Sequence, residues 1–132
     1  MTQEAFPRGY AGTGADDITA NTALLDGPHP TMVVDVPSNT AVQQYQLVTL
    51  SGSALAVIGG APSGGEVVGV VAEAADNLTA TPVAERHGKV TVYVGGGFND
   101  AKIVMSASTV AAWRATALGS GIRLRTALVT PV

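Results

Sequence analysis

From residue 31 onwards, the chain consists of short apolar segments separated by glycine, proline, serine and asparagine. The segments are rich in valine, and they have the length of strands rather than of helices. The clearest of them cover residues 32–36, 45–50, 54–58, 67–72, 83–85, 90–94 and 122–129. This spacing predicts one all-β domain over residues 31–132, with six to eight short strands and one or two short helices.

The connections between these segments are predicted from turn-forming residues, at positions 51–53, 59–65, 76–77, 86–89 and 95–97. Residues 51–53 (Ser-Gly-Ser) predict a tight hairpin. Gly95 to Gly97 are expected to end the strand that precedes them. Residues 67–72 are almost continuously apolar, which is typical of a strand buried on both faces.

One helix is predicted over residues 109–118, capped by Ser106 or Ser108 and ended by Gly119 as its C′ residue. Its apolar stripe consists of Val110, Trp113 and Ala117. Small alanine side chains around the stripe would let a neighbour approach closely. In the last strand, Arg123 and Arg125 are expected on the face opposite Ile122 and Leu124. The stripe and the two arginines are our candidate subunit interface.

Residues 1–30 differ from the rest because proline, glycine and polar residues interrupt every periodic pattern. Ordering about 25 residues costs on the order of 25–50 kcal/mol of backbone entropy. Burying the isolated large side chains returns only roughly 8–15 kcal/mol. We therefore expect a flexible arm that becomes ordered only on a partner, although a tail without a role is the alternative. The side chains available for such a contact are Phe6, Tyr10, Ile18, Leu24 and Leu25.

Charge is scarce and unevenly distributed. Charged residues make up 13% of the chain, where about 25% is usual. We infer that other protein chains cover much of the surface, although a weakly charged monomer is the alternative. Residues 1–85 carry nine acids and one base, a net charge of −8, whereas residues 86–132 carry six bases and one acid, a net charge of +5. This division favours pairing between the two parts, within one subunit or across neighbours.

Several classes of function are disfavoured. The isoelectric point near 5.1 argues against a protein that neutralises nucleic-acid phosphates. The chain has no cysteine, no apolar signal-like start and no apolar run long enough for a membrane span. His29 and His87 are expected to be solvated turn residues, and the glycines fit no phosphate-binding pattern. We therefore expect no catalytic, cofactor or metal site, and no enzymatic activity.

The order of several segments resembles the lambda-like head decoration proteins of tailed phages. The resemblance covers roughly residues 42–132 and depends mainly on the segments YQLVTLSGSALAV, EVVGVVAEAADN, VTVYVGGGFN and RATALGSGI. It implies a bent β-ribbon, β-clip-like (β-tulip) fold assembled as a homotrimer. It also implies that the trimer binds the major capsid protein at three-fold sites of the expanded head and stabilises it against DNA pressure. The N-terminal arm would add to a sheet of the capsid protein.

The resemblance places the protein on the outer surface of the virion after synthesis in the host cytoplasm, as a cement protein without cofactors. The chain departs from the family in residues 26–39, which are additional, and after Phe98, where an expected Trp-Pro is missing. Two other functions stay open. One is a trimeric β-fold enzyme such as a nucleotide hydrolase, and the other is an adhesin-like module that binds glycans or cells.

Overall fold

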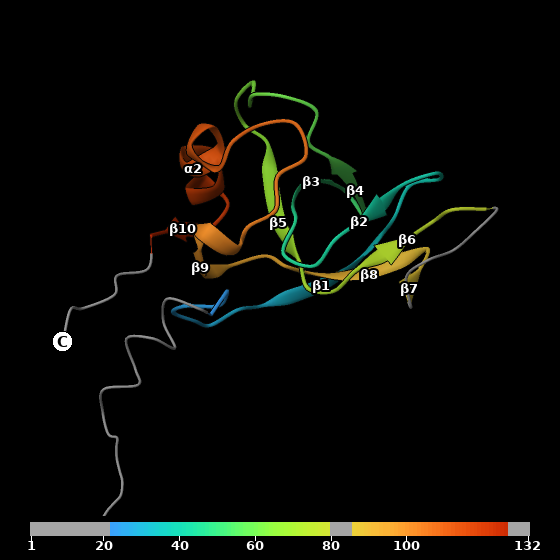
Figure 1. Cartoon of the computed structure of the whole chain (residues 1–132), viewed down its shortest axis with the longest axis horizontal. Helices are drawn as coiled ribbons and strands as arrows, with labels where there is room; N and C mark the ends of the chain where they lie inside the picture. The colour runs from blue at the N-terminus through green and yellow to red at the C-terminus, as the bar shows by residue number, and fades with distance from the viewer. Residues whose placement is uncertain (1–21, 80–85, 127–132) are drawn as a thin grey trace, which may run out of the picture.

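The computed structural model describes residues 22–79 and 86–126, and the fold in this part is mostly β, as predicted (Figure 1). Five strands form a small closed barrel in the order β1-β4-β3-β5-β8. Their bounds are β1 Thr31–Asp35, β3 Leu47–Ser51, β4 Ala54–Val57, β5 Val67–Val71 and β8 Lys89–Tyr93. The predicted segments 32–36, 45–50, 54–58, 67–72 and 90–94 therefore all contain strands, whereas residues 83–85 lie outside the described part.

Neighbouring strands of the barrel are antiparallel except at one seam. β3 and β4 form the predicted hairpin, in which Ser51 pairs with Ala54. β1 and β4 run parallel and meet at a single residue pair, Asp35 with Ala54. Valine fills the barrel because its branched side chain packs well on a pleated strand surface. The buried residues of this inner core are Val34, Val36, Val42, Val48, Leu55, Val71, Ala75, Val90 and Val92.

A second layer covers the outside of β3 and β5. It consists of α2 (Val110–Gly119), β9 (Gly96–Asn99) and β10 (Ile122–Arg125), and β9 and β10 pair in parallel. This layer and the barrel enclose an outer core, whose buried residues are Leu47, Ile58, Val68, Val70, Phe98, Ile103, Trp113, Ala117, Ile122 and Leu124. Val68 and Val70 face this outer core and Val71 faces the inner one. The prediction of a strand buried on both faces is therefore confirmed for β5.

Three short strands form a separate small sheet in the order β2-β6-β7. They are β2 Ala41–Val42, β6 Ala75–Asp76 and β7 Arg86–His87. Two predicted turns are therefore wrong, because Asp76 pairs with Ala41 and residues 86–87 pair with β6. The 3-10 helix η1 (Asp100–Lys102) follows β9.

Gly95 to Gly97 do not simply end β8, because Gly96 and Gly97 begin β9 and pair with Ile122 and Arg123. The helix is confirmed, but its ends differ from the prediction. Thr109, rather than Ser106 or Ser108, caps α2 by accepting a hydrogen bond from the Ala112 amide. At the other end, Gly119 is still helical and Gly121, at φ 86°, has the left-handed conformation that usually follows a helix C-cap.

Candidate interaction surfaces

The ion pairs of the described residues join the acidic and basic parts of the same chain. Five of the six pairs connect an acid before residue 80 with a basic side chain after residue 85. The within-subunit alternative is therefore the observed one. The five are Glu73–Arg86 (2.9 Å), Asp76–His87 (2.9 Å), Asp35–Lys89 (2.5 Å), Asp26–Arg123 (2.9 Å) and Asp26–Arg125 (2.5 Å).

Two other acids also have hydrogen-bond partners within the chain. Asp100 pairs with Arg114 at 3.0 Å, and the Thr126 hydroxyl donates to the same carboxylate. Burial alone would raise the pKa of Asp100, but the hydrogen bonds from Thr126 and Arg114 outweigh it and hold the pKa below its ordinary value. Glu66 accepts hydrogen bonds from the backbone amides of Ser63 and Gly64, both at 2.7 Å, and these lower its pKa. Every acid in the described part thus has a partner within the chain.

One side of the molecule carries almost no charge. Residues 36–65 contain no Asp, Glu, Lys, Arg or His. The only charged residue of α2 is Arg114, whose guanidinium donates to the Leu124 carbonyl and to Asp100. In Figure 1, α2, the loop 59–65 and the β3–β4 hairpin lie toward the upper edge, and β1, β7, β8, β9 and β10 lie below them. We call the upper group the uncharged side.

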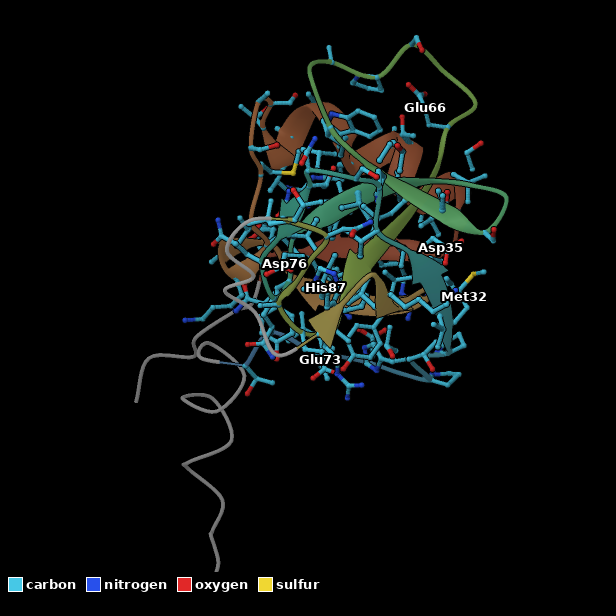
Figure 2. The ribbon with its side chains drawn as sticks, turned by 90° about the vertical axis from the view of Figure 1, so that its right-hand side faces the viewer. Met32, Asp35, Glu66, Glu73, Asp76 and His87 are labelled. Carbon is cyan, nitrogen blue, oxygen red and sulfur yellow. The ribbon has the colours of Figure 1, made fainter. Side chains whose placement is uncertain are left out.

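Glu66 borders the uncharged side, and the ion-paired acids lie elsewhere. Figure 2 shows Glu66 on the upper loop, while Glu73, Asp76 and His87 lie far below it. Hydrogen bonds from its own loop hold Glu66, and a partner that covers this side would remove its carboxylate from water. Desolvation of an unpaired charge is the term that most often opposes protein contacts.

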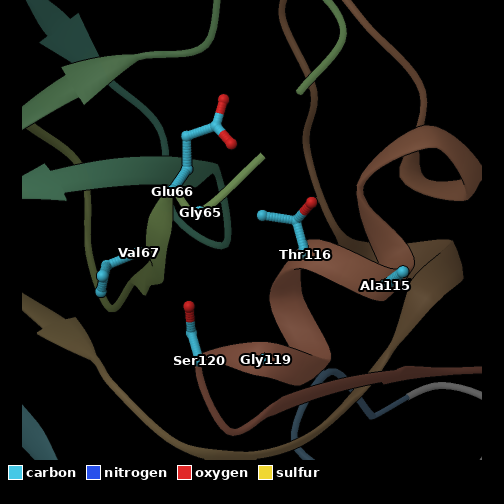
Figure 3. A pocket seen from close by; sticks show the side chains of 7 residues that line it. All are labelled: Gly65, Glu66, Val67, Ala115, Thr116, Gly119 and Ser120. Atoms are coloured by element: carbon cyan, nitrogen blue, oxygen red, sulfur yellow. The ribbon is translucent and has the colours of Figure 1, made fainter. Parts of the chain in front are cut away.

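The uncharged side contains an open pocket of about 430 Å³ between α2 and the start of β5 (Figure 3). Its lining is mostly small and neutral, and it consists of Gly65, Glu66, Val67, Ala115, Thr116, Gly119 and Ser120. Val67 is 54% exposed at this pocket, and Leu118, on the same helix as three of the lining residues, is 62% exposed. A pocket with these walls can bind an apolar side chain by shape, but it presents no free reactive group.

Hydrogen bonds fix the walls of this pocket. The Trp113 indole donates to the Gly60 carbonyl at 3.0 Å, which ties the loop 59–65 to α2. The Ser120 hydroxyl accepts from the Val68 amide at 3.1 Å, which ties the end of α2 to β5. The pocket is therefore held by the same contacts that attach the outer layer to the barrel.

A second surface is formed where residues 22–30 cross β9. The Leu25 amide donates to the Gly97 carbonyl, the Gly97 amide to the Asp26 carbonyl, and the Asn99 amide to the Ala23 carbonyl, at 2.7–2.9 Å. His29 Nε2 lies 2.9 Å from the Gly97 carbonyl oxygen. The His29 ring packs edge-on against Tyr93 and Phe98. In the structure, residues 22–30 therefore lie on the body, although we expected the arm to extend to residue 30.

The predicted arm residues fall into two groups. Phe6, Tyr10 and Ile18 lie outside the described residues. Leu24 forms a bridge with Phe98 and packs against the outer core, and Leu25 bonds to Gly97. Both leucines therefore contact their own chain.

The residues of the predicted subunit interface mostly contact their own chain in the structure. Trp113 and Ala117 are 3% and 0% exposed in the outer core, and Val110 packs against that core. The apolar stripe of α2 is thus covered by the chain's own barrel and offers almost no surface to a partner. Arg123 and Arg125 lie on the predicted face, but both bind Asp26. The exposed Leu118 and the pocket beside it were not predicted, because sequence periodicity identifies the buried stripe and not what covers it.

The two histidines also differ from the prediction. His29 is half-buried in the contact with β9. His87 is half exposed but bonds through Nδ1 to the fully buried carboxylate of Asp76. Within residues 22–79 and 86–126, no group of three or more His, Cys, Asp or Glu is arranged to hold a metal ion. In the same part, no helix is long and apolar enough to cross a membrane.

Comparisons with known protein families, with curated proteins and with solved structures find no match for this chain.

Proposed function

We propose that this chain is a head decoration protein of a tailed phage, which binds the expanded capsid as a homotrimer and stabilises it against the pressure of packaged DNA. The observation that carries the proposal is that residues 36–65 contain no charged residue, so that one side of the described part, around α2 and the loop 59–65, carries few charges. Such a side is suited to permanent contacts with neighbouring proteins. The segment order that resembles lambda-like decoration proteins supplies the identity of those neighbours, which are other copies and the major capsid protein.

The proposal assigns the capsid contact to residues 1–21. Residues 22–30 lie on β9, so the described part begins beside this strand. Phe6, Tyr10 and Ile18 would fill pockets of the capsid protein, while the backbone would add to one of its sheets. The bent β-ribbon form of the trimer belongs to the same proposal.

Stabilisation would come from the number of contacts and not from chemistry. A contact of standard size buries about 800 Å² per partner, equivalent to about 20 kcal/mol of gross hydrophobic free energy. Rigid-body and ordering costs consume much of that amount. Repetition over many sites still increases the internal pressure that a shell withstands.

The test compares the full chain with a variant that begins at residue 22, mixed with expanded and with unexpanded head shells of lambda-like phages. The variant keeps every contact of residues 22–30 with β9 and is expected to stay folded by circular dichroism. We expect the full chain to bind expanded shells only, and the variant to lose that binding.

Two results would contradict the proposal. One is full occupancy of expanded shells by the shortened chain, which would remove the role of the arm. The other is that the full chain binds neither form of the shell, which would contradict the proposed function.

A further inference from the structure

We propose that the copies of this protein contact each other through Leu118 of one copy and the pocket between α2 and β5 of the next. The inference goes beyond the proposed function in naming the contact, and it rests on that function only for the number of copies, three. It places the subunit contact on the uncharged side and not on the predicted stripe and arginine face.

Leu118 is an exposed leucine near the end of α2. It is the most exposed of the large hydrophobic residues in the described part, at 62%. It lies between Ala117, which is in the outer core, and Gly119, which lines the pocket. Leu118 itself does not line the pocket of its own chain, so its side chain is available to another molecule.

The pocket beside this leucine has small residues in its lining. Ala115, Gly119 and Gly65 have little or no side chain, which leaves an open hollow of about 430 Å³ at this end of the helix (Figure 3). Thr116 and Val67 add apolar methyl groups to its walls. A branched apolar side chain such as leucine suits this lining, and the same molecule presents one on the same helix.

The surfaces that would meet carry few charges. The contact would bring together two copies of a side that contains no charged residue in positions 36–65. Glu66 accepts hydrogen bonds from Ser63 and Gly64, and Arg114 is held by Asp100 and the Leu124 carbonyl. Apart from the Glu66 carboxylate, the lining offers a charged partner no group for an ion pair, whereas the exposed leucine of a second copy suits its shape.

The symmetry of the contact follows from these two features. The protruding side chain and the pocket are different features on one surface, so each copy can give a leucine to one neighbour and receive one from the other. Such a head-to-tail contact forms a closed ring when the rotation between copies allows it. A stable contact needs about 800 Å² per partner, which requires the loop 59–65 and the exposed face of α2 to take part as well.

The test measures mass in solution by sedimentation velocity over a range of protein concentrations, for the full chain and two variants. Leu118→Lys puts a cation where the contact should be, and a lysine is well tolerated in the last turn of a helix. Val33→Lys is the matched control, since Val33 is 60% exposed on β1, away from the pocket. We expect the wild type and Val33→Lys to sediment at about 40 kDa, three times 13.2 kDa. For Leu118→Lys we expect the dissociation constant of the oligomer to be 10- to 100-fold higher.

A second measurement uses the lack of native cysteine. Leu118→Cys and Thr116→Cys variants are mixed and oxidised, and we expect a cross-linked dimer that neither variant forms to the same extent alone. A monomeric wild type, an oligomer unaffected by Leu118→Lys, or a mixture that cross-links no better than its components would overturn the inference. An oligomer that Leu118→Lys dissociates but that binds no shell would support the inference and overturn only the proposed function.

Discussion

Gly96 and Gly97 show at the scale of single residues why three glycines occur together before Phe98. A Cβ atom on Gly97 would overlap the Asp26 carboxylate and lie 3.3 Å from the Asp26 carbonyl oxygen. A Cβ atom on Gly96 would overlap the His29 ring. The missing side chains therefore allow residues 22–30 to approach β9 closely.

Gly97→Ala should displace Asp26 from β9 and weaken its pairs with Arg123 and Arg125. We expect a loss of about 1–3 kcal/mol in the free energy of unfolding, as for other overpacked sites, and faster amide exchange at Leu25 and Gly97. Gly59→Ala is the control because a Cβ there meets nothing within 4 Å. Equal stability of the two variants, measured by urea denaturation, would show that residues 22–30 do not depend on this approach.

The carboxylates also set a pH dependence. Hydrogen bonds from Arg123, from Lys89 and from the Ser63 amide lower the pKa values of Asp26, Asp35 and Glu66, respectively. A group with a lowered folded-state pKa contributes its full stabilisation above its unfolded pKa and loses it as the pH falls through the folded value. We therefore expect the urea midpoint to fall as the pH decreases from 5 to below 4.

The matched variant for this pH dependence is Asp26→Asn, which cannot titrate at that position. Its urea midpoint should fall less steeply than that of the wild type over the same range. A midpoint that rises between pH 5 and pH 3 would contradict the assignment of these carboxylates as paired in the folded state.

At the scale of elements, the barrel strands could be predicted because each contains its own signal. The β-branched alternation and the flanking turn residues of β1, β3, β4, β5 and β8 are local in sequence. β6, β7 and β9 could not be predicted in the same way. β9 consists half of glycine and becomes a strand by pairing with β10, whose first residue lies 26 positions after the first residue of β9.

The helix shows the same limit for the candidate surface. Its apolar stripe, predicted as a candidate subunit interface, is buried within the chain, and a sequence does not state whether the chain itself or a neighbour covers such a stripe. The structure places Trp113 against the barrel, and only this arrangement identifies Leu118 as the residue left for a partner. The pocket joins residues 65–67 to residues 115–120, a proximity that no local pattern contains.

The attachment of the loop 59–65 to α2 can be tested with Trp113→Phe, which keeps an aromatic ring but removes the indole N–H. The Gly60 carbonyl would lose its donor, and we expect a cost of about 1–2 kcal/mol together with faster amide exchange in residues 59–65. The unfolding of both proteins is followed by circular dichroism and not by tryptophan fluorescence, because the substitution removes the only tryptophan of the chain. Unchanged exchange in the loop would mean that other contacts hold the pocket wall.

At the scale of the whole molecule, the two candidate surfaces are formed by different residues, although α2 contacts β10 and Arg114 bonds to Asp100. Residues 23 and 126, near the two ends of the described chain, both lie beside the end of β9. The Ala23 carbonyl accepts from the Asn99 amide, and Thr126 bonds to Asp100. The uncharged side lies on α2 and the β3–β4 hairpin instead (Figure 1). A protein that joins its own copies and also binds a shell needs this separation, because each contact must form without covering the other.

The response to salt distinguishes the two places where copies could meet. Raising the ionic strength from 0.1 M to 1 M shortens the screening length from about 10 Å to about 3 Å. A contact through Leu118 and the pocket contains no ion pair, so its dissociation constant should change by less than about threefold over this range. A contact through Arg123 and Arg125 with acids of a neighbour would weaken by far more, because exposed ion pairs are screened. Sedimentation at both salt concentrations decides between the two contacts, with circular dichroism as the check on folding. Dissociation at 1 M NaCl would indicate that the subunits meet through the arginine face of β10.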